Sequence, residues 1–169
     1  MKKLIALAAA ATISAPAMAQ FDTPVNIALR IGYAYPLDST TRDAVRNFIG
    51  VGADYFFGKS LVGDNGETTL SFDWLGKSGS GAKGNAFPIL LNQRFYGPAR
   101  PGTSQRTYAF FGAGVAIVDV TSTQTVWAAR AGYGVELGEK IFAEGNLLIT
   151  DSAGGARASS IGIYVGYRF

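Results

Sequence analysis

The last ten residues of the chain, 160–169, alternate strictly between apolar residues and residues that are small or polar. In an extended strand, one face would carry Ile161, Ile163, Val165, Tyr167 and Phe169. The opposite face would carry Gly162, Tyr164, Gly166 and Arg168. Successive side chains of a strand point to opposite sides, so this segment has one apolar face that ends in aromatic rings. A strand of about ten residues with this pattern is typical of a transmembrane β-barrel with lipid outside and a polar interior.

Seven earlier segments show the same period of two. The predicted strands are 25–35, 48–57, 67–75, 86–96, 106–118, 126–137, 140–150 and 160–169. No helical crossover separates them, so the sequence predicts an all-β fold: an eight-stranded antiparallel up-and-down transmembrane barrel. An even number of strands brings both chain ends to the periplasmic side, together with the turns after the second, fourth and sixth strands.

Two details of this assignment depend on local sequence. Segment 37–47 is polar and is predicted to be a long loop with one helical turn capped by Ser39 or Thr40. Segment 106–118 is apolar on both faces, which leaves its register weakly specified. We expect Phe111 and Val115 to point outward there, and Tyr108 to point inward.

The N-terminus has the three parts of a secretory signal peptide. Lys2 and Lys3 precede the apolar segment 4–13, and Ala17-Met18-Ala19 forms a small-residue cleavage site. The sequence therefore predicts a signal peptide at 1–19 and a single barrel domain at 20–169. Without Lys2 and Lys3 the chain has 13 basic and 12 acidic side chains, a balance that gives no reason to expect a nucleic-acid partner.

The chain contains no cysteine and no histidine. It therefore lacks disulfides, thiolate metal ligands, and the commonest general base and transition-metal ligand. We predict no cofactor, no metal site and no enzymatic activity. No apolar segment after residue 19 reaches the roughly 20 residues of a membrane-spanning helix. Entry into a membrane would require a closed barrel, because an open sheet leaves backbone groups unpaired in lipid.

Charged residues recur on the face opposite the main apolar set. They are Arg30, Asp54, Asp73, Arg94, Arg130, Glu136, Glu144 and Arg168. An arginine on the lipid face at the bilayer midplane costs about 2–4 kcal/mol, so we expect these side chains to point into the barrel. The interior of eight strands is just wide enough for side chains to fill, and buried charges there must pair. Glycines on the same face would make room for them.

Two interpretations of the charged set remain open from the sequence alone. The charges form either a salt-bridged plug or the lining of a narrow pore that opens when the pairs exchange. Aromatic residues cluster toward strand ends on the apolar face, as in the interfacial girdles of membrane barrels. These residues are Tyr33, Tyr35, Tyr55, Phe57, Trp74, Phe95, Trp127, Tyr167 and Phe169. The alternative for the same aromatic residues is the core of a soluble sandwich.

The signal ending in Ala-Met-Ala, the eight amphipathic strands and the closing Ile-Gly-Ile-Tyr-Val-Gly-Tyr-Arg-Phe resemble the small bacterial outer-membrane β-barrels. That group includes the OmpA transmembrane domain, OmpX, OmpW and opacity-type proteins. The resemblance implies a monomer in the outer membrane, surrounded by lipid and lipopolysaccharide. It also implies periplasmic chaperones and the barrel assembly machinery as partners, with Tyr167 and Phe169 as the assembly signal. Outer-membrane enzymes such as lipid A deacylases, palmitoyltransferases and omptin proteases use an essential histidine, which this chain lacks.

Three functions follow as hypotheses. The first is a structural or surface-interaction protein with a filled interior. The second is a narrow channel for small or hydrophobic solutes, as the resemblance to OmpW implies. The third is a soluble ligand-binding barrel.

Overall fold

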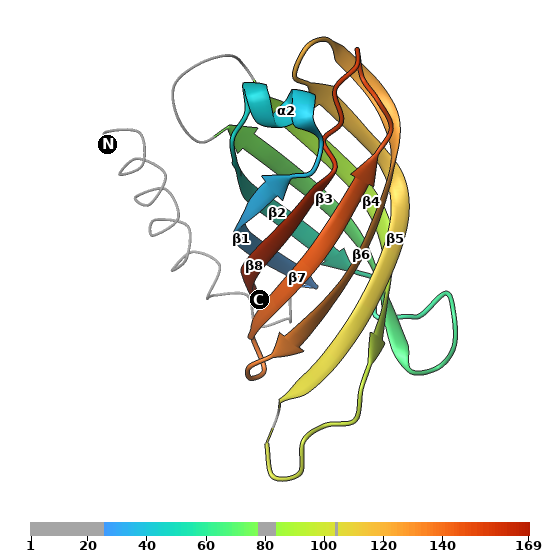
Figure 1. Cartoon of the computed structure of the whole chain (residues 1–169). Coiled ribbons are helices and arrows are strands. Elements are labelled where there is room, and N and C mark those ends of the chain that lie inside the picture. Colours follow the sequence, from blue (N-terminus) through green and yellow to red (C-terminus); the bar gives the residue numbers. More distant parts are fainter. Residues whose placement is uncertain (1–25, 78–83, 104) are drawn as a thin grey trace.

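The computed structural model describes residues 26–77, 84–103 and 105–169, which form one closed barrel (Figure 1). Within this part of the chain the elements are β1 (Ile27–Pro36), α2 (Ser39–Ala44), β2 (Phe48–Phe56), β3 (Gly66–Lys77), β4 (Asn85–Tyr96), β5 (Arg106–Asp119), β6 (Thr123–Glu136), β7 (Ile141–Thr150) and β8 (Ser160–Arg168). The predicted eight-stranded antiparallel up-and-down barrel is confirmed. The predicted signal peptide at 1–19 lies outside the described residues.

Each strand pairs antiparallel with its neighbours in sequence, and β1 pairs with β8 to close the sheet. The amide of Phe169 donates to the carbonyl of Ile27 at 3.0 Å, so both described ends of the chain lie at one end of the barrel. We call this the terminal end, and we call the opposite end, where α2 lies, the α2 end (Figure 1).

Some strands are longer than the sequence pattern predicts. β6 begins at Thr123 and not at Val126, because Thr123 pairs with Asp119 across a tight hairpin. β3 continues to Lys77, which pairs with Phe48. Hydrogen-bonded pairing with a neighbouring strand extends these segments past the point where the hydrophobic alternation stops.

The helical turn in the first long loop is present, but its predicted cap was wrong. The N-cap is Asp38 and not Ser39 or Thr40. Asp38 has extended backbone angles, and its carboxylate accepts from the amide of Thr41 at 2.9 Å. An N-cap residue must itself be non-helical and must reach an amide two or three residues ahead, which Asp38 does here.

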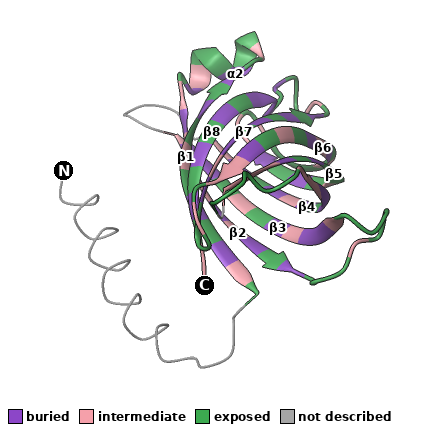
Figure 2. Cartoon of the chain, turned by 90° about the horizontal axis from the view of Figure 1, so that it is seen from below, coloured by how far each residue is buried: buried purple, intermediate pink, exposed green. Residues whose placement is uncertain are grey.

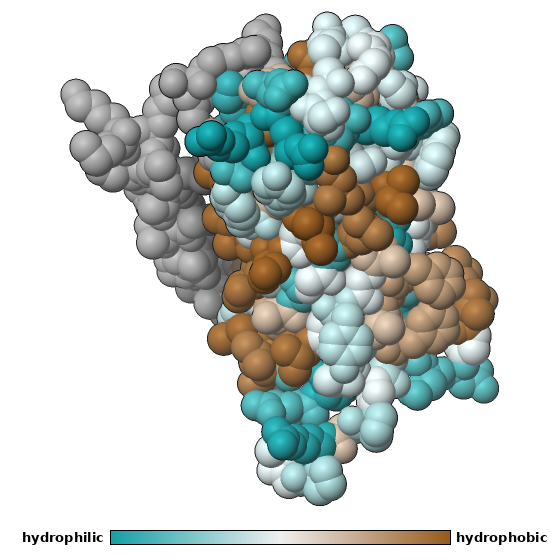
Figure 3. All heavy atoms as spheres, in the orientation of Figure 1, coloured by the Kyte–Doolittle hydropathy of each residue, from teal (hydrophilic) through white to brown (hydrophobic). Residues whose placement is uncertain are grey.

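The two faces of the sheet have opposite character. In Figure 2 the view into the barrel shows buried and exposed residues alternating along the strands. In Figure 3 hydrophobic side chains gather across the middle of the outer face, with hydrophilic ones toward both ends. The predicted register of β5 is confirmed, since Phe111 and Val115 are exposed on the outside and Tyr108 is buried.

The interior contains two apolar clusters. The cluster at the α2 end includes Val45, Phe48, Leu75, Ala86, Leu90, Val118, Leu148, Ala158 and Tyr164. The cluster at the terminal end includes Ala28, Phe56, Tyr108, Phe110 and Phe142, with Tyr96 packed against it. The space between the two clusters is where inward polar side chains must lie.

Glycines make room for the large inward side chains, as the sequence suggested. A Cβ at Gly32 would collide with the carbonyl oxygen of Ile163 and with the ring of Tyr164, and one at Gly50 would lie 2.6 Å from the same ring. On the outer face, a Cβ at Gly145 would meet only a carbonyl oxygen at 3.8 Å. The interior is therefore packed at Gly32 and Gly50, whereas the outer face is open at Gly145.

Among the described residues, no helix is both long and apolar enough to cross a membrane.

We predict that Gly32→Ala lowers the free energy of unfolding by about 1–3 kcal/mol, because the added methyl overpacks the interior. Urea unfolding of the protein in phospholipid vesicles measures the change. Gly145→Ala is the matched control, and we expect its stability to be unchanged or slightly raised, since glycine is unfavourable within a strand. Equal destabilisation by both variants would contradict the packing argument.

Candidate functional site

A buried arginine at the centre of the barrel joins three carboxylates from three strands. Arg30, on β1, donates from Nη1 to Asp54 on β2 at 3.1 Å and to Glu144 on β7 at 2.8 Å. Its Nη2 donates to Asp73 on β3 at 2.7 Å. Arg30, Asp54 and Glu144 have side chains at most 1% exposed, so these ion pairs are shielded from bulk solvent.

A second arginine adds ion pairs on the side of the terminal end. Arg94 donates from Nη2 to Asp54 at 2.9 Å and lies 3.6 Å from Glu144. Its guanidinium carbon lies 4.8–5.8 Å from the ring centroids of four aromatic residues. These are Phe56, Tyr108, Phe110 and Phe142. Aromatic faces attract a cation at these distances, and more strongly when water is excluded.

A third arginine links the charges to neutral polar groups. Arg130 donates to Asp73 at 2.8 Å and to the hydroxyl of Ser71 at 2.7 Å. The Ser71 hydroxyl in turn donates to Asp54 in a short hydrogen bond. Asn92 accepts a bond from Arg130 at 3.3 Å. Each arginine is thus held by several partners from different strands.

These contacts join six of the eight charged residues proposed from the sequence into one network of three cations and three anions. The central network comprises Arg30, Asp54, Asp73, Arg94, Arg130 and Glu144. Its formal charge is zero. Burying ions is costly unless they are paired and hydrogen-bonded, and this network provides both kinds of partner.

The other two proposed residues lie elsewhere. Arg168 pairs with Glu67 at 2.9 Å, and Glu136 pairs with Arg106. Both pairs are partly exposed near the terminal end. The guanidinium carbon of Arg168 lies 3.9 Å from the ring centroid of Phe56. Neither residue contributes an ion pair to the central network.

The sequence reasoning missed several interior residues. Glu67 and Arg106 stand at the first positions of their predicted strands and were not counted as interior charges. Strand parity places both on the inward face, because Glu67 has the same parity as Asp73 on β3, and Arg106 has the same parity as Tyr108 on β5. Parity alone would therefore have identified them. The neutral partners Ser71 and Asn92 show the same parity, but nothing in their residue types sets them apart.

The two aromatic residues proposed as an assembly signal lie next to each other at the last strand. The rings of Tyr167 and Phe169 meet edge to face with centroids 5.0 Å apart. The Nζ of Lys140 lies 5.7 Å from the Tyr167 ring. Tyr167 remains 40% exposed on the outer face. Their role in assembly stays a prediction.

The central network lies between the two apolar clusters. Along β2, Phe48 belongs to the cluster at the α2 end, Asp54 to the network and Phe56 to the cluster at the terminal end. Along β7, Leu148, Glu144 and Phe142 follow the same order. An ion moving along the axis would therefore have to pass two packed apolar layers. In the described part of the chain, no three aspartate or glutamate side chains lie close enough together to hold a metal ion.

Comparison with known proteins supports the fold. A family model described as outer membrane protein beta-barrel domain matches residues 5–169. No curated protein matches the sequence. The solved structures that resemble this one share its fold at low sequence identity.

Three of these structures illustrate the similarity. The outer membrane enzyme PagL is 12% identical, with 85% of this chain and 97% of that chain covered and a TM-score of 0.56. Neisserial surface protein A is 9% identical, with 88% and 100% covered and a TM-score of 0.53. The N-terminal β-barrel domain of Pseudomonas aeruginosa OprF is 19% identical, with 87% and 100% covered and a TM-score of 0.50. At these identities the likeness shows the fold alone.

We predict that Arg30→Ala lowers the free energy of unfolding by about 3–5 kcal/mol, because it leaves buried carboxylates without their shared cation. Arg106→Ala is the matched control. Its side chain is 38% exposed, and loss of an exposed ion pair costs about 0–1 kcal/mol. Urea unfolding in phospholipid vesicles compares the two. Similar losses for both variants would show that the central network is no more important for stability than a surface pair.

Proposed function

Because the chain belongs to the outer membrane protein β-barrel domain family, we propose that it acts as a closed, non-conducting barrel with a structural or surface-interaction role. One observation carries this proposal. The barrel interior holds an electrically neutral, hydrogen-bonded charge network between two apolar layers. A conducting pore needs a continuous polar path, and this arrangement of side chains opposes one.

The α2 end supports the same proposal, because its loops are tied together. The hydroxyl of Thr41 on α2 donates to the carbonyl of Arg157 at 2.7 Å, and the amide of Leu37 donates to Ser159 at 2.8 Å. Thr121 donates to the carbonyl of Gly154 at 2.9 Å. These bonds connect three loops into one cap over the apolar cluster. A cap of this kind presents a defined surface at the α2 end.

The proposal includes the following placement and partners. The segment 1–19 directs export, the terminal end lies on the periplasmic side, and the α2 end faces outward. Phospholipid and lipopolysaccharide surround a monomer. Periplasmic chaperones and the barrel assembly machinery deliver it to the membrane, and Tyr167 and Phe169 serve as the assembly signal.

We also propose that the protein is not an enzyme. PagL is described as an outer membrane enzyme, but at 12% identity its similarity concerns the fold. The present chain has no histidine, and its buried carboxylates are engaged by arginines. The proposed role therefore rests on the sealed interior and on the surface of the barrel.

We predict that the purified barrel gives no stepwise currents in planar phospholipid bilayers at either polarity. Arg30→Ala should also remain silent, because the apolar layers containing Phe48 and Phe56 persist on both sides of the altered network. Bilayers that receive detergent alone are the control, and heat-dependent gel mobility verifies that each sample is folded. Reproducible channel openings by the unmodified protein would instead favour a narrow channel for small solutes.

A further inference from the structure

The loop between β2 and β3, residues 57–65, folds back onto the outer face of the barrel. It is held there by Thr68 and Gln93, which lie opposite each other on β3 and β4. The side chain of Gln93 accepts from the hydroxyl of Thr68 at 2.8 Å and from the amide of Leu61 at 3.1 Å. Its amide group donates to the hydroxyl of Ser60 at 2.8 Å.

The burial of these two polar residues is unusual for their position. Both have outward strand parity, yet Thr68 is only 3% exposed and Gln93 only 6% exposed. A polar side chain without a partner is costly in an apolar environment, and the loop supplies the missing partners. The loop is therefore a fixed overhang against the outer wall near the terminal end.

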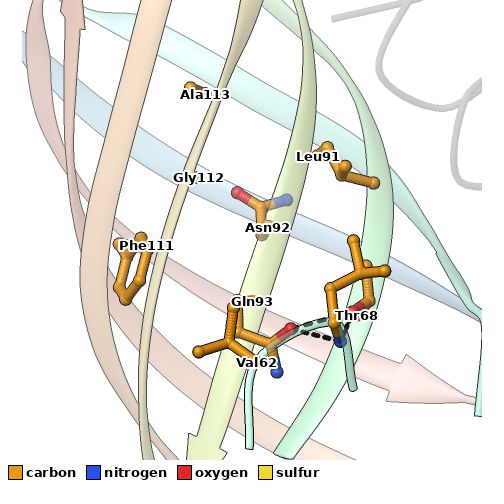
Figure 4. Close-up of a pocket in the computed structure, with 9 residues that line it drawn as sticks. Val62, Thr68, Leu91, Asn92, Gln93, Phe111, Gly112 and Ala113 are labelled. Carbon is orange, nitrogen blue, oxygen red and sulfur yellow. Dashed lines mark hydrogen bonds between the residues drawn. The ribbon is translucent and has the colours of Figure 1, made fainter. Parts of the chain in front are cut away.

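The overhang does not lie flat on the wall. A cavity of about 220 Å³ separates Leu61 and Val62 of the loop from Leu91, Phe111 and Ala113 of the barrel wall (Figure 4). Leu61 is 72% exposed and Val62 54% exposed, so both apolar side chains lack a protein partner over much of their surface. The cavity is smaller than the roughly 300–1,000 Å³ of small-molecule sites, which suits a segment of a chain better than a whole ligand.

The cavity forms a groove between the loop and the barrel wall. We propose that this groove binds one acyl chain of a phospholipid in the periplasmic leaflet. The groove wall is continuous with the outer surface of the barrel, which faces hydrocarbon in this family. Leu91 and Phe111 belong to that surface, since their side chains are 43% and 56% exposed. The ring of Phe111 stacks on that of Phe95, with the two ring centroids 5.6 Å apart. A space with mainly apolar walls excludes water and accepts apolar guests. The choice of the periplasmic leaflet rests on the proposed function, which places the terminal end on the periplasmic side. The binding of an acyl chain does not depend on that orientation.

The wall offers a direct test because alanine lies at the groove and also one strand beyond it. Ala113 lines the groove, and Ala131 is an exposed alanine on β6 that pairs with Phe111. The full chain is refolded into vesicles of phosphatidylethanolamine and phosphatidylglycerol that also contain lipopolysaccharide. It is then extracted in detergent and examined by native mass spectrometry. We expect the unmodified protein and Ala131→Phe to retain one phospholipid, and Ala113→Phe to lose it.

Three results would overturn the proposal. They are equal lipid retention by Ala113→Phe and Ala131→Phe, retention of lipopolysaccharide in place of phospholipid, and a second copy of the chain in place of lipid. Heat-dependent gel mobility shows whether Ala113→Phe has folded.

A second measurement places the lipid at the groove. Because the chain has no native cysteine, Val62→Cys can carry a single fluorophore. We expect quenching by a nitroxide on a phospholipid acyl chain and little quenching by iodide in water. In the double variant that combines Val62→Cys with Ala113→Phe, we expect the nitroxide to quench the fluorophore less. Strong quenching by iodide in the single variant Val62→Cys would overturn the proposal. The outcome of the conductance experiment does not affect the quenching experiment. The proposal of a non-conducting barrel and the proposal of an acyl-chain groove can therefore fail separately.

Discussion

Hydrocarbon offers no hydrogen-bond partner to a backbone amide, and the architecture of this protein follows from that constraint. A sheet can cross such a medium only if its first and last strands pair, as β1 and β8 do from Ala28–Arg168 to Pro36–Ser160. Closure by eight strands then fixes a narrow lumen that side chains can fill. Apolar residues must face outward, so every charged residue of the strand centres is directed into a space with little water.

The interior meets this demand by distributing its charges and its apolar groups in layers. Three arginines and three carboxylates balance at the centre, and each charged group touches partners from more than one strand. Aromatic rings around Arg94 and the apolar cluster at the α2 end keep water away on both sides. Low polarity strengthens the ion pairs and also raises the cost of leaving any one unpaired. The network and the apolar layers therefore depend on each other.

Strand parity made most of the fold predictable from the sequence, because a period of two assigns each residue to a face without knowledge of its neighbours. It placed Arg30, Asp54 and Glu144 inside, but it could not pair them. Arg30 and Glu144 are 114 positions apart, and their contact depends on the register of several strands and on closure. The cap at Asp38 and the early start of β6 were missed for a similar reason. Both depend on hydrogen bonds that the hydrophobic pattern does not encode.

Departures from the pattern were themselves informative. Gln93 interrupts the apolar set of β4, and Thr68 is a polar member of the outward set of β3. A single polar residue on the outer face would need no special explanation. In the structure, however, the two residues pair across β3 and β4, and the loop that carries Leu61 and Val62 covers both. A polar pair on a lipid-facing wall needs partners, and a connecting loop is a ready source of them. In this barrel the polar break at Thr68 and Gln93 marks the point where the loop folds back onto the wall, and the loop places its own apolar side chains, Leu61 and Val62, beside that wall.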